Sequence, residues 1–189
     1  MKKNRFELKK EANHEELIRS GLKLVETTGA DLLHLDLVAE RANCSRATLF
    51  NHFHSREVLL EAILLPVIEE GITWIIEITD KGTPTFKDIS RLCYKLWLNH
   101  SDKIYLANCR KTLADNPLLT EKHDQFVRLF LGLFQSLKKQ KQLRLENPEA
   151  SARMAFRCFG SILDSLPADD STEVLFHQCL KGLLFNLEV

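Results

Sequence analysis

The chain has 189 residues, and its 26 acidic and 26 basic side chains give a formal net charge of zero. Hydrophobic residues make up 44% and charged residues 28%, which is typical of a folded globular protein and argues against a disordered or fibrous chain. No apolar run reaches the roughly 18 residues that span a membrane, and no apolar signal core follows the basic N-terminus, so we expect a cytoplasmic protein without a membrane partner. The five scattered cysteines form no C-x-x-C pair and indicate reduced thiols.

Positive charge is concentrated in two segments, although the total charge is zero. Residues 1–10 carry Lys2, Lys3, Arg5, Lys9 and Lys10 against one acidic residue. Residues 41–56 carry three arginines and no acidic residue. This distribution is what a DNA contact requires of a chain whose overall charge is neutral.

Helical spacing dominates the whole sequence. Apolar residues recur three and four positions apart, whereas β-branched residues never alternate over a usable length, so the predicted fold class is all-α. Asn13 and Glu16 have the spacing of a capping box, and Gly29 ends the apolar stripe that follows. These signals predict a first helix over residues 15–28.

Three more helices are predicted in the next part of the chain. The second covers residues 35–42, and Asn43 suits the left-handed turn beyond its end. Ser45 is the expected cap of a third helix over residues 46–52, and Ser55 of a fourth helix that begins at Arg56. Pro66 lies inside that fourth helix and should kink it.

Turn residues divide the remainder into about five helices, which gives about nine in all. The turns are Gly82 with Pro84, Ser101-Asp102, Asn116-Pro117, Asn147-Pro148 and the segment from Leu166 to Asp170. The predicted helices lie near 85–99, 102–114, 119–141, 149–166 and 171–187.

The second and third helices form a predicted helix-turn-helix, in which the second of the pair enters the major groove of DNA. With a start at Arg46, Leu49 and Phe53 turn inward, and the remaining side chains face the groove and its walls. Ser45 and the free amides of the first turn offer a phosphate site, which the helix dipole reinforces. Phe50 can lie along the sugar-phosphate chain. The residues expected to contact DNA are Ser45, Arg46, Ala47, Thr48, Phe50, Asn51, His52 and Arg56.

The segment from Val38 to Leu60 resembles the signature of the TetR family of transcriptional regulators. That signature contains an Ile-Ala pair, an Ala-Gly-Val-Ser turn, a Thr-Leu-Tyr, a His-Phe, then Ser-Lys-Glu and two leucines. The resemblance extends from the first helix to the start of the fourth, about fifty residues with many positions in fixed order.

Several positions depart from the signature. Asn43 replaces the turn glycine, and Cys44 replaces an aliphatic residue. Phe50 replaces the usual tyrosine and so lacks its hydrogen bond to phosphate, whereas Arg56 replaces lysine and keeps the charge. His34 stands where a threonine often caps the second helix, so that cap is weaker or is provided by Asp36.

The resemblance implies a ligand-responsive repressor that binds a palindromic operator as a homodimer. Residues 1–55 would form the DNA-binding domain, and residues 56–189 a helical domain for effector binding and dimerisation. An alternative keeps the helix-turn-helix but makes the second half a constitutive dimer or protein-interaction module without a small-molecule pocket.

Aromatic residues in the second half recur at helical spacing, which is more often a feature of a core than of a ligand cage. The resemblance nevertheless implies a pocket for an unknown small-molecule effector in this region. The residues expected to line it are Trp74, Tyr94, Trp97, Tyr105, Phe126 and Phe130.

The last two predicted helices carry more apolar surface than one intramolecular face can use. This surplus predicts a four-helix dimer interface, a mode that resembles dimerisation in the family. The residues expected there are Phe159, Ile162, Leu163, Leu166, Leu180, Leu183 and Leu184.

Enzyme motifs are absent from the sequence. There is no G-x-x-x-x-G-K, G-x-G-x-x-G or H-E-x-x-H. His52 and His54 are two residues apart and do not share a helix face, which disfavours a metal pair. We therefore expect no catalytic residues, no metal and no cofactor.

Overall fold

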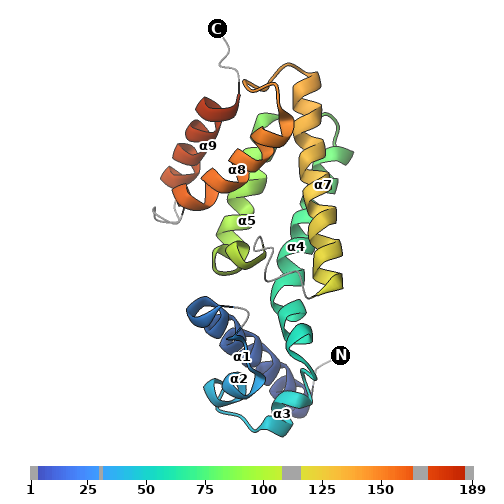
Figure 1. Ribbon diagram of the computed structural model, residues 1–189, viewed down its shortest axis with the longest axis vertical. Helices are drawn as coiled ribbons and strands as arrows, with labels where there is room; N and C mark the ends of the chain where they lie inside the picture. The colour runs from blue at the N-terminus through green and yellow to red at the C-terminus, as the bar shows by residue number, and fades with distance from the viewer. Residues whose placement is uncertain (1–3, 30–31, 108–115, 164–169, 186–189) are drawn as a thin grey trace. The chain divides into compact units, whose positions relative to one another are not determined.

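The computed structural model describes residues 4–29, 32–107, 116–163 and 170–185. These residues form eight α-helices and no strand, apart from an isolated bridge between Leu143 and Phe185 (Figure 1), which confirms the all-α prediction. The helices are α1 (Arg5–Thr28), α2 (Leu35–Arg41), α3 (Arg46–Phe50), α4 (Arg56–Asp80), α5 (Phe86–Ala107), α7 (Pro117–Lys139), α8 (Pro148–Leu163) and α9 (Asp170–Leu184).

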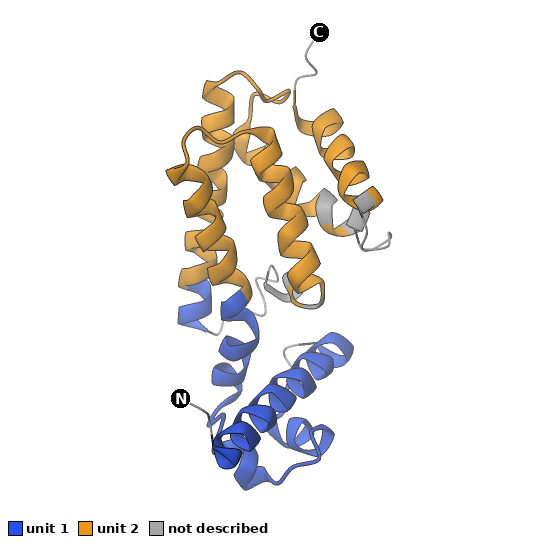
Figure 2. Cartoon of the chain, turned by 180° about the vertical axis from the view of Figure 1, so that it is seen from behind, with its two compact units in different colours: residues 1–66, 109–120 blue, residues 67–108, 121–189 orange. Residues whose placement is uncertain are grey.

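The chain divides into two compact units, coloured separately in Figure 2. Unit 1 comprises residues 1–66 and 109–120, and unit 2 comprises residues 67–108 and 121–189. Helix α4 passes from unit 1 to unit 2 at Pro66, which lies within the helix. The kink expected at this proline and the functional division after residue 55 stay predictions.

Helix α1 begins ten residues before its predicted start. The side chain of Asn4 accepts a hydrogen bond from the Glu7 backbone N–H at 2.9 Å, and the Asn4 N–H donates to the Glu7 carboxylate at 2.8 Å. This pair is a complete capping box, so the prediction that Asn13 caps the helix is wrong. The predicted end is confirmed, because Gly29 adopts φ 86° and its N–H donates to the Val25 carbonyl at 2.9 Å.

The core of unit 1 joins α1, α2, α3 and the start of α4. Leu17, Val38, Leu49 and Leu59 are each no more than 1% exposed. Gly21 allows α1 to approach α4 closely, because a Cβ at this position would lie 3.1 Å from Cδ2 of Leu59. The short helices are therefore held on a packed support, despite having few backbone hydrogen bonds of their own.

Unit 2 contains most of α4 and α7 together with α5, α8 and α9. Helix α5 contacts both α8 and α9, which also contact each other. The predicted helices 85–99 and 102–114 are not separated by a turn within the described residues. Instead α5 continues to Ala107 through a kink at His100, whose φ and ψ of −142° and 29° are not helical. No described helix is both long and apolar enough to cross a membrane.

Candidate nucleic-acid interface

The turn between α2 and α3 is closed by backbone hydrogen bonds. Asn43 adopts the left-handed conformation with φ 49°, as predicted. Its N–H donates to the Glu40 carbonyl at 3.0 Å, and the Cys44 N–H donates to the Ala39 carbonyl at 3.0 Å. Asparagine therefore fills the position that the family signature gives to glycine, and the turn keeps its geometry.

Ser45 caps α3, as the sequence predicts. Its Oγ accepts from the Thr48 N–H at 3.0 Å, and the two hydroxyl oxygens lie 2.8 Å apart. The α2 cap differs, because His34 makes no capping hydrogen bond with its side chain. The Ser45 hydroxyl therefore already orders the first turn of α3, whether or not it also contacts a phosphate.

Helix α3 ends at Phe50, two residues earlier than predicted, and Asn51 is its C-cap. Leu49 and Phe53 are 0% and 1% exposed, which confirms that they turn inward. Anchored in this way, the helix leaves one surface free. That surface contains Arg46, Ala47, Phe50 and Asn51, which are exposed, and Thr48 and His52, which are half-buried.

Arg46 forms a two-point ion pair with Asp36 of α2. Its Nε lies 2.7 Å from Oδ1 of Asp36, and its terminal nitrogen donates to Oδ2 at 2.8 Å. Both side chains are largely exposed, at 72% and 56%, so the pair contributes about 1 kcal/mol at most and can be exchanged for another anion. The ten-residue separation carries no sequence signal, and the predicted site therefore omitted Asp36.

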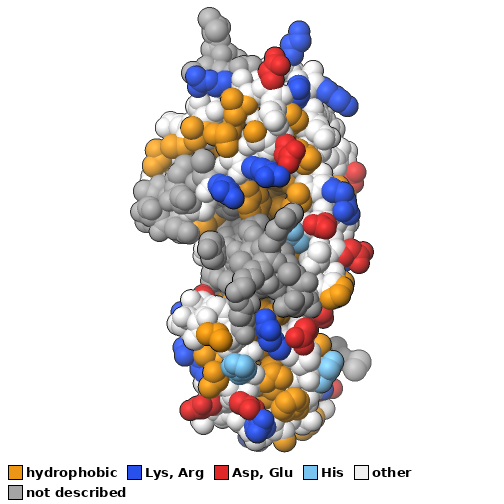
Figure 3. Space-filling model, viewed as in Figure 1, with side chains coloured by type: hydrophobic (Ala, Val, Ile, Leu, Met, Phe, Trp, Pro, Cys, Tyr) orange, Lys and Arg blue, Asp and Glu red, His pale blue; other side chains and the backbone are white. Residues whose placement is uncertain are grey.

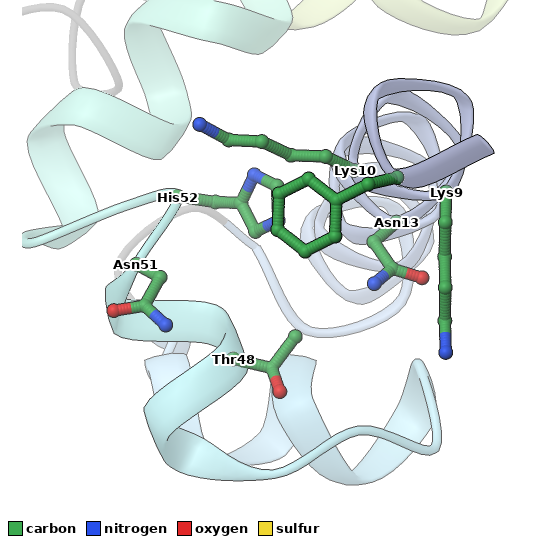
Figure 4. A pocket seen from close by; sticks show the side chains of 7 residues that line it. Lys9, Lys10, Asn13, Thr48, Asn51 and His52 are labelled. Carbon is green, nitrogen blue, oxygen red and sulfur yellow. The ribbon is translucent and has the colours of Figure 1, made fainter. Parts of the chain in front are cut away.

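The N-terminal half of α1 lies beside α3. A hollow of about 530 Å³ in unit 1 lies between them. Its lining residues are Phe6, Lys9, Lys10, Asn13, Thr48, Asn51 and His52. Figure 4 shows Lys9, Lys10 and Asn13 reaching from α1, and Thr48, Asn51 and His52 from α3 and the turn that follows it. Residues 1–10 are recognisably basic in the sequence. Because the predicted helix began only at residue 15, the sequence could not show which of these basic residues lie next to α3.

His52 lies where these two elements meet. Its ring centroid is 5.4 Å from that of His14, which in turn stacks on Phe53 at 4.8 Å. Burial lowers the pKa of His52 below its ordinary value, and the positive charges of His14 and Lys10 lower it further. Its imidazole is therefore biased towards the neutral form until an anion approaches.

Ser55 and Arg56 lie at the start of α4. The Val58 N–H donates to Oγ of Ser55 at 3.3 Å, which agrees with the predicted cap. Arg56 is half-buried, and its Nε is buried without a hydrogen-bond partner among the described residues. The contact between Arg56 and DNA that the sequence predicts stays a prediction.

The residues predicted to line an effector pocket all belong to unit 2. Tyr94, Trp97, Phe126 and Phe130 are buried, and Trp74 is half-buried. The ring centroids of Tyr94 and Trp97 lie 5.9 Å apart, and those of Phe126 and Phe130 lie 5.8 Å apart. The predicted side chain of Tyr105 lies outside the described residues.

One polar group of unit 2 was missed by sequence reasoning. His100 is the kink residue of α5, its side chain is 13% exposed, and its Nε2 pairs with the Glu70 carboxylate. Its Nδ1 is buried without a hydrogen-bond partner in the described part of the chain. The two residues are thirty positions apart, so no local pattern indicated the pair.

The predicted dimer residues differ in how far their side chains are exposed. Leu180 and Leu184 are buried within the chain at 2% and 1%, whereas Leu183 is 43% exposed. Val174 and Leu175, on the same helix, are 55% and 42% exposed. Figure 3 shows hydrophobic side chains gathered over α9 on the face in view. The side chains of Phe159, Ile162 and Leu163, and all of Leu166, lie outside the described residues.

Residues 17–63 match the family model described as bacterial regulatory proteins of the tetR family. Over this segment the chain is similar to the TetR family of regulatory proteins. The match covers α2, α3, the turn between them and the start of α4. These elements include α3 with its exposed surface and the helices that support it.

Several solved structures share the fold of the chain. AmtR of Mycobacterium smegmatis is 16% identical with a TM-score of 0.72, and the alignment covers 93% of this chain and 87% of that one. The ketosteroid transcriptional regulator KstR2 of Mycobacterium tuberculosis is 13% identical with a TM-score of 0.72, covering 92% and 95%. A gamma-butyrolactone receptor described as ArpA-like is 14% identical with a TM-score of 0.67, covering 93% and 98%. No curated protein sequence shows a significant match.

The matching family model describes regulatory proteins, and KstR2, one of the structures that share the fold, is a transcriptional regulator. The described residues contain no group of three or more histidine, cysteine, aspartate or glutamate side chains that could hold a metal ion.

Proposed function

We propose that this protein is a ligand-responsive repressor of the TetR family that acts in the cytoplasm and binds a palindromic operator as a homodimer. The observation that carries the proposal is the anchoring of α3. Leu49 and Phe53 are buried, so the side chains of Arg46, Thr48 and Asn51 are left on the outer surface of a braced helix. An arginine suits guanine and an asparagine suits adenine in the major groove.

Dimerisation is supported by the apolar surface of α9. Val174, Leu175 and Leu183 are between 42% and 55% exposed although they are aliphatic. Water-facing aliphatic residues on one helix favour a contact with a second copy of the chain. A two-fold dimer presents two equivalent recognition helices, and this symmetry favours a palindromic site.

Effector binding is supported by His100. A mostly buried imidazole with one nitrogen paired to Glu70 and the other without a partner among the described residues can anchor the polar end of a ligand. Two structures of similar fold are named for small molecules, a ketosteroid regulator and a gamma-butyrolactone receptor. His100 also marks the kink in α5, so a ligand there would act on a point where the helix already departs from regular geometry.

A constitutive role for unit 2, without an effector, is favoured by a different observation. The rings of Phe126 and Phe130 pack against each other, and each also meets Phe156 edge-on at 5.7 and 5.5 Å. Rings that fill the space between helices in this way act as core residues.

Two measurements test the proposal. In the first, the wild-type protein selects duplexes from a pool of random sequence, and the selected duplexes should share a palindromic sequence. A selected pool without palindromic enrichment would contradict binding of an operator by a two-fold dimer. A thermal-shift screen with tetraphenylphosphonium and decanoate, as representatives of lipophilic cations and fatty acids, should then raise the melting temperature for one class. The shift should disappear in His100→Ala, whereas unchanged melting with every compound tested would favour the constitutive alternative.

A further inference from the structure

The N-terminal half of α1 is a capped helical segment that presents one face to α3. The capping box of Asn4 and Glu7 fixes its first turn. Phe6, Lys9, Lys10 and Asn13 follow at spacings of three and four, so they share one side of the helix. The hollow of about 530 Å³ lies between this side and Thr48, Asn51 and His52 (Figure 4).

The hollow has a positive electrostatic character. Lys9 and Lys10 are exposed, and no acidic residue is among the described side chains that line it. Glu7 is held in the capping box with Asn4 instead. Burial lowers the pKa of His52 first, and the charges of His14 and Lys10 lower it further, which agrees with a positive potential at this place.

The position of the hollow indicates its occupant. Thr48 and Asn51 line it and also belong to the surface of α3 and its cap that the proposed function places in the major groove. A sugar-phosphate strand borders every major groove, so a duplex docked on α3 brings a strand towards α1. The ring of Phe6 is 76% exposed and offers an apolar surface to a deoxyribose, while the two ammonium groups can donate to phosphate oxygens.

We propose that the N-terminal half of α1 is a second DNA-contacting element, in which Lys9 and Lys10 bind the phosphates of one strand beside the groove that α3 enters. This inference rests on the proposed function, because it requires that α3 docks on duplex DNA. The inference places a sugar-phosphate strand of DNA at the hollow. Contacts to phosphates do not read bases, so this contact should be independent of base sequence.

The test compares two full-length variants that each remove two positive charges. Lys9→Gln/Lys10→Gln alters the hollow, and Lys138→Gln/Lys139→Gln alters two exposed lysines in the last turn of α7. Affinity for the selected duplex and for a random duplex is measured from low to high salt. The Lys9/Lys10 variant should weaken both duplexes by the same factor and flatten the plot of log affinity against log salt by about 0.9 for each phosphate that the protein no longer neutralises. The α7 variant should keep the wild-type slope.

Lys9→Arg/Lys10→Arg should restore the slope, because arginine also binds phosphate, and circular dichroism checks that every variant is folded. An unchanged salt slope in the Lys9/Lys10 variant would overturn the inference, and so would an equal flattening in the α7 variant. Failure of the proposed function looks different, since the wild-type chain itself would then bind no duplex.

Discussion

Asp36 should have two opposite effects on the proposed contact between Arg46 and DNA. The carboxylate holds the guanidinium at two points, so the fork is oriented before DNA arrives. The same carboxylate is an exposed negative charge on the surface proposed to meet phosphates. Because an exposed ion pair is worth only about 0–1 kcal/mol, the guanidinium can leave it for a guanine.

We predict that Arg46→Ala lowers affinity for the selected operator by about 1–3 kcal/mol, the value of a good base contact, with a smaller effect on random duplex. Asp36→Asn should strengthen binding to random duplex, since it removes a repulsive charge, and reduce the ratio of operator to random affinity because the arginine is no longer oriented. Competition mobility shifts measure both ratios. Equal weakening for operator and random duplex in Arg46→Ala would place the arginine on the backbone rather than on a base.

The lowered pKa of His52 predicts that both stability and DNA binding depend on pH. Its pKa in the free protein lies below that of an unfolded histidine, first because of burial and then because of His14 and Lys10. The unfolded state therefore binds more protons in the window between the two values, so this group stabilises the fold above about pH 6.5 and the stabilisation falls as pH drops through the window. Two other charged residues are relevant to the charge of His52. Lys9 of α1 lines the same hollow, and Arg56 follows His52 by four residues in the chain.

A phosphate near His52 would reverse this trend for binding, because it stabilises the imidazolium. We predict that operator affinity rises as the pH is lowered from about 7.5 to about 5.5, a range that brackets the ordinary histidine pKa, and that His52→Gln reduces this rise. His177→Gln is the matched control, since burial also lowers the pKa of His177 but its neighbours belong to unit 2. Fluorescence anisotropy at constant ionic strength measures the effect. The same pH dependence in His52→Gln and wild type would remove His52 from the DNA contact.

Beside the buried residues that helical spacing marks, the single residues placed correctly from the sequence are those with local partners. Ser45 caps α3 across three residues, and Asn43 needs only its own backbone conformation. Asp36 with Arg46 and Glu70 with His100 are ten and thirty residues apart, so only the packing of helices brings them together. A hydrogen bond between residues a few positions apart can be predicted from a sequence, whereas a contact between residues ten or thirty positions apart cannot.

At the scale of elements, the start of α1 was predicted wrongly because two capping signals compete for it. The spacing of an asparagine and a glutamate occurs at Asn4 and Glu7 and again at Asn13 and Glu16, and the structure uses the earlier pair. The later pair lies in mid-helix. This choice extends α1 and creates the hollow beside α3, so an error in one boundary concealed a feature of the candidate site.

Close helix packing in unit 2 depends on Gly71 of α4. A Cβ at this position would lie 2.8 Å from Cε2 of Phe126, a ring already fixed by Phe130 and Phe156. Gly132 lies within α7, and a Cβ there would meet nothing within 4 Å. The two glycines have the same helix propensity but opposite surroundings.

We predict that Gly71→Ala destabilises the protein and Gly132→Ala stabilises it. Alanine gains up to about 1 kcal/mol in helix propensity at either site, but overpacking costs about 1–3 kcal/mol at Gly71 alone. The midpoint of urea denaturation should therefore fall for the first variant and rise for the second. An increase in both midpoints would mean that the Phe126 ring moves aside without cost.

At the scale of the whole molecule, the exposed aliphatic residues of α9 bear on assembly. Leu175 and Leu183 are eight residues apart and lie along the same side of the helix as Cys179 between them. Leu180 and Leu184 hold α9 in its own chain, since both are buried. The buried residues thus hold α9 in unit 2, whereas Leu175 and Leu183 stay exposed and are available to a partner.

We predict that the wild-type protein sediments at twice the 21.8 kDa of one chain and that Leu175→Glu/Leu183→Glu shifts it to the monomer. Buried carboxylates would face each other across a two-fold interface, and neither could be solvated there. Val127→Glu is the control, because Val127 is 44% exposed on α7 and should leave the dimer intact. The monomeric variant should bind the palindromic duplex no more tightly than it binds a single half-site, since each monomer has only one α3 to place in a major groove. A double variant that remained dimeric would move the interface away from α9, whereas a monomer with full operator affinity would contradict the two-fold mode of binding.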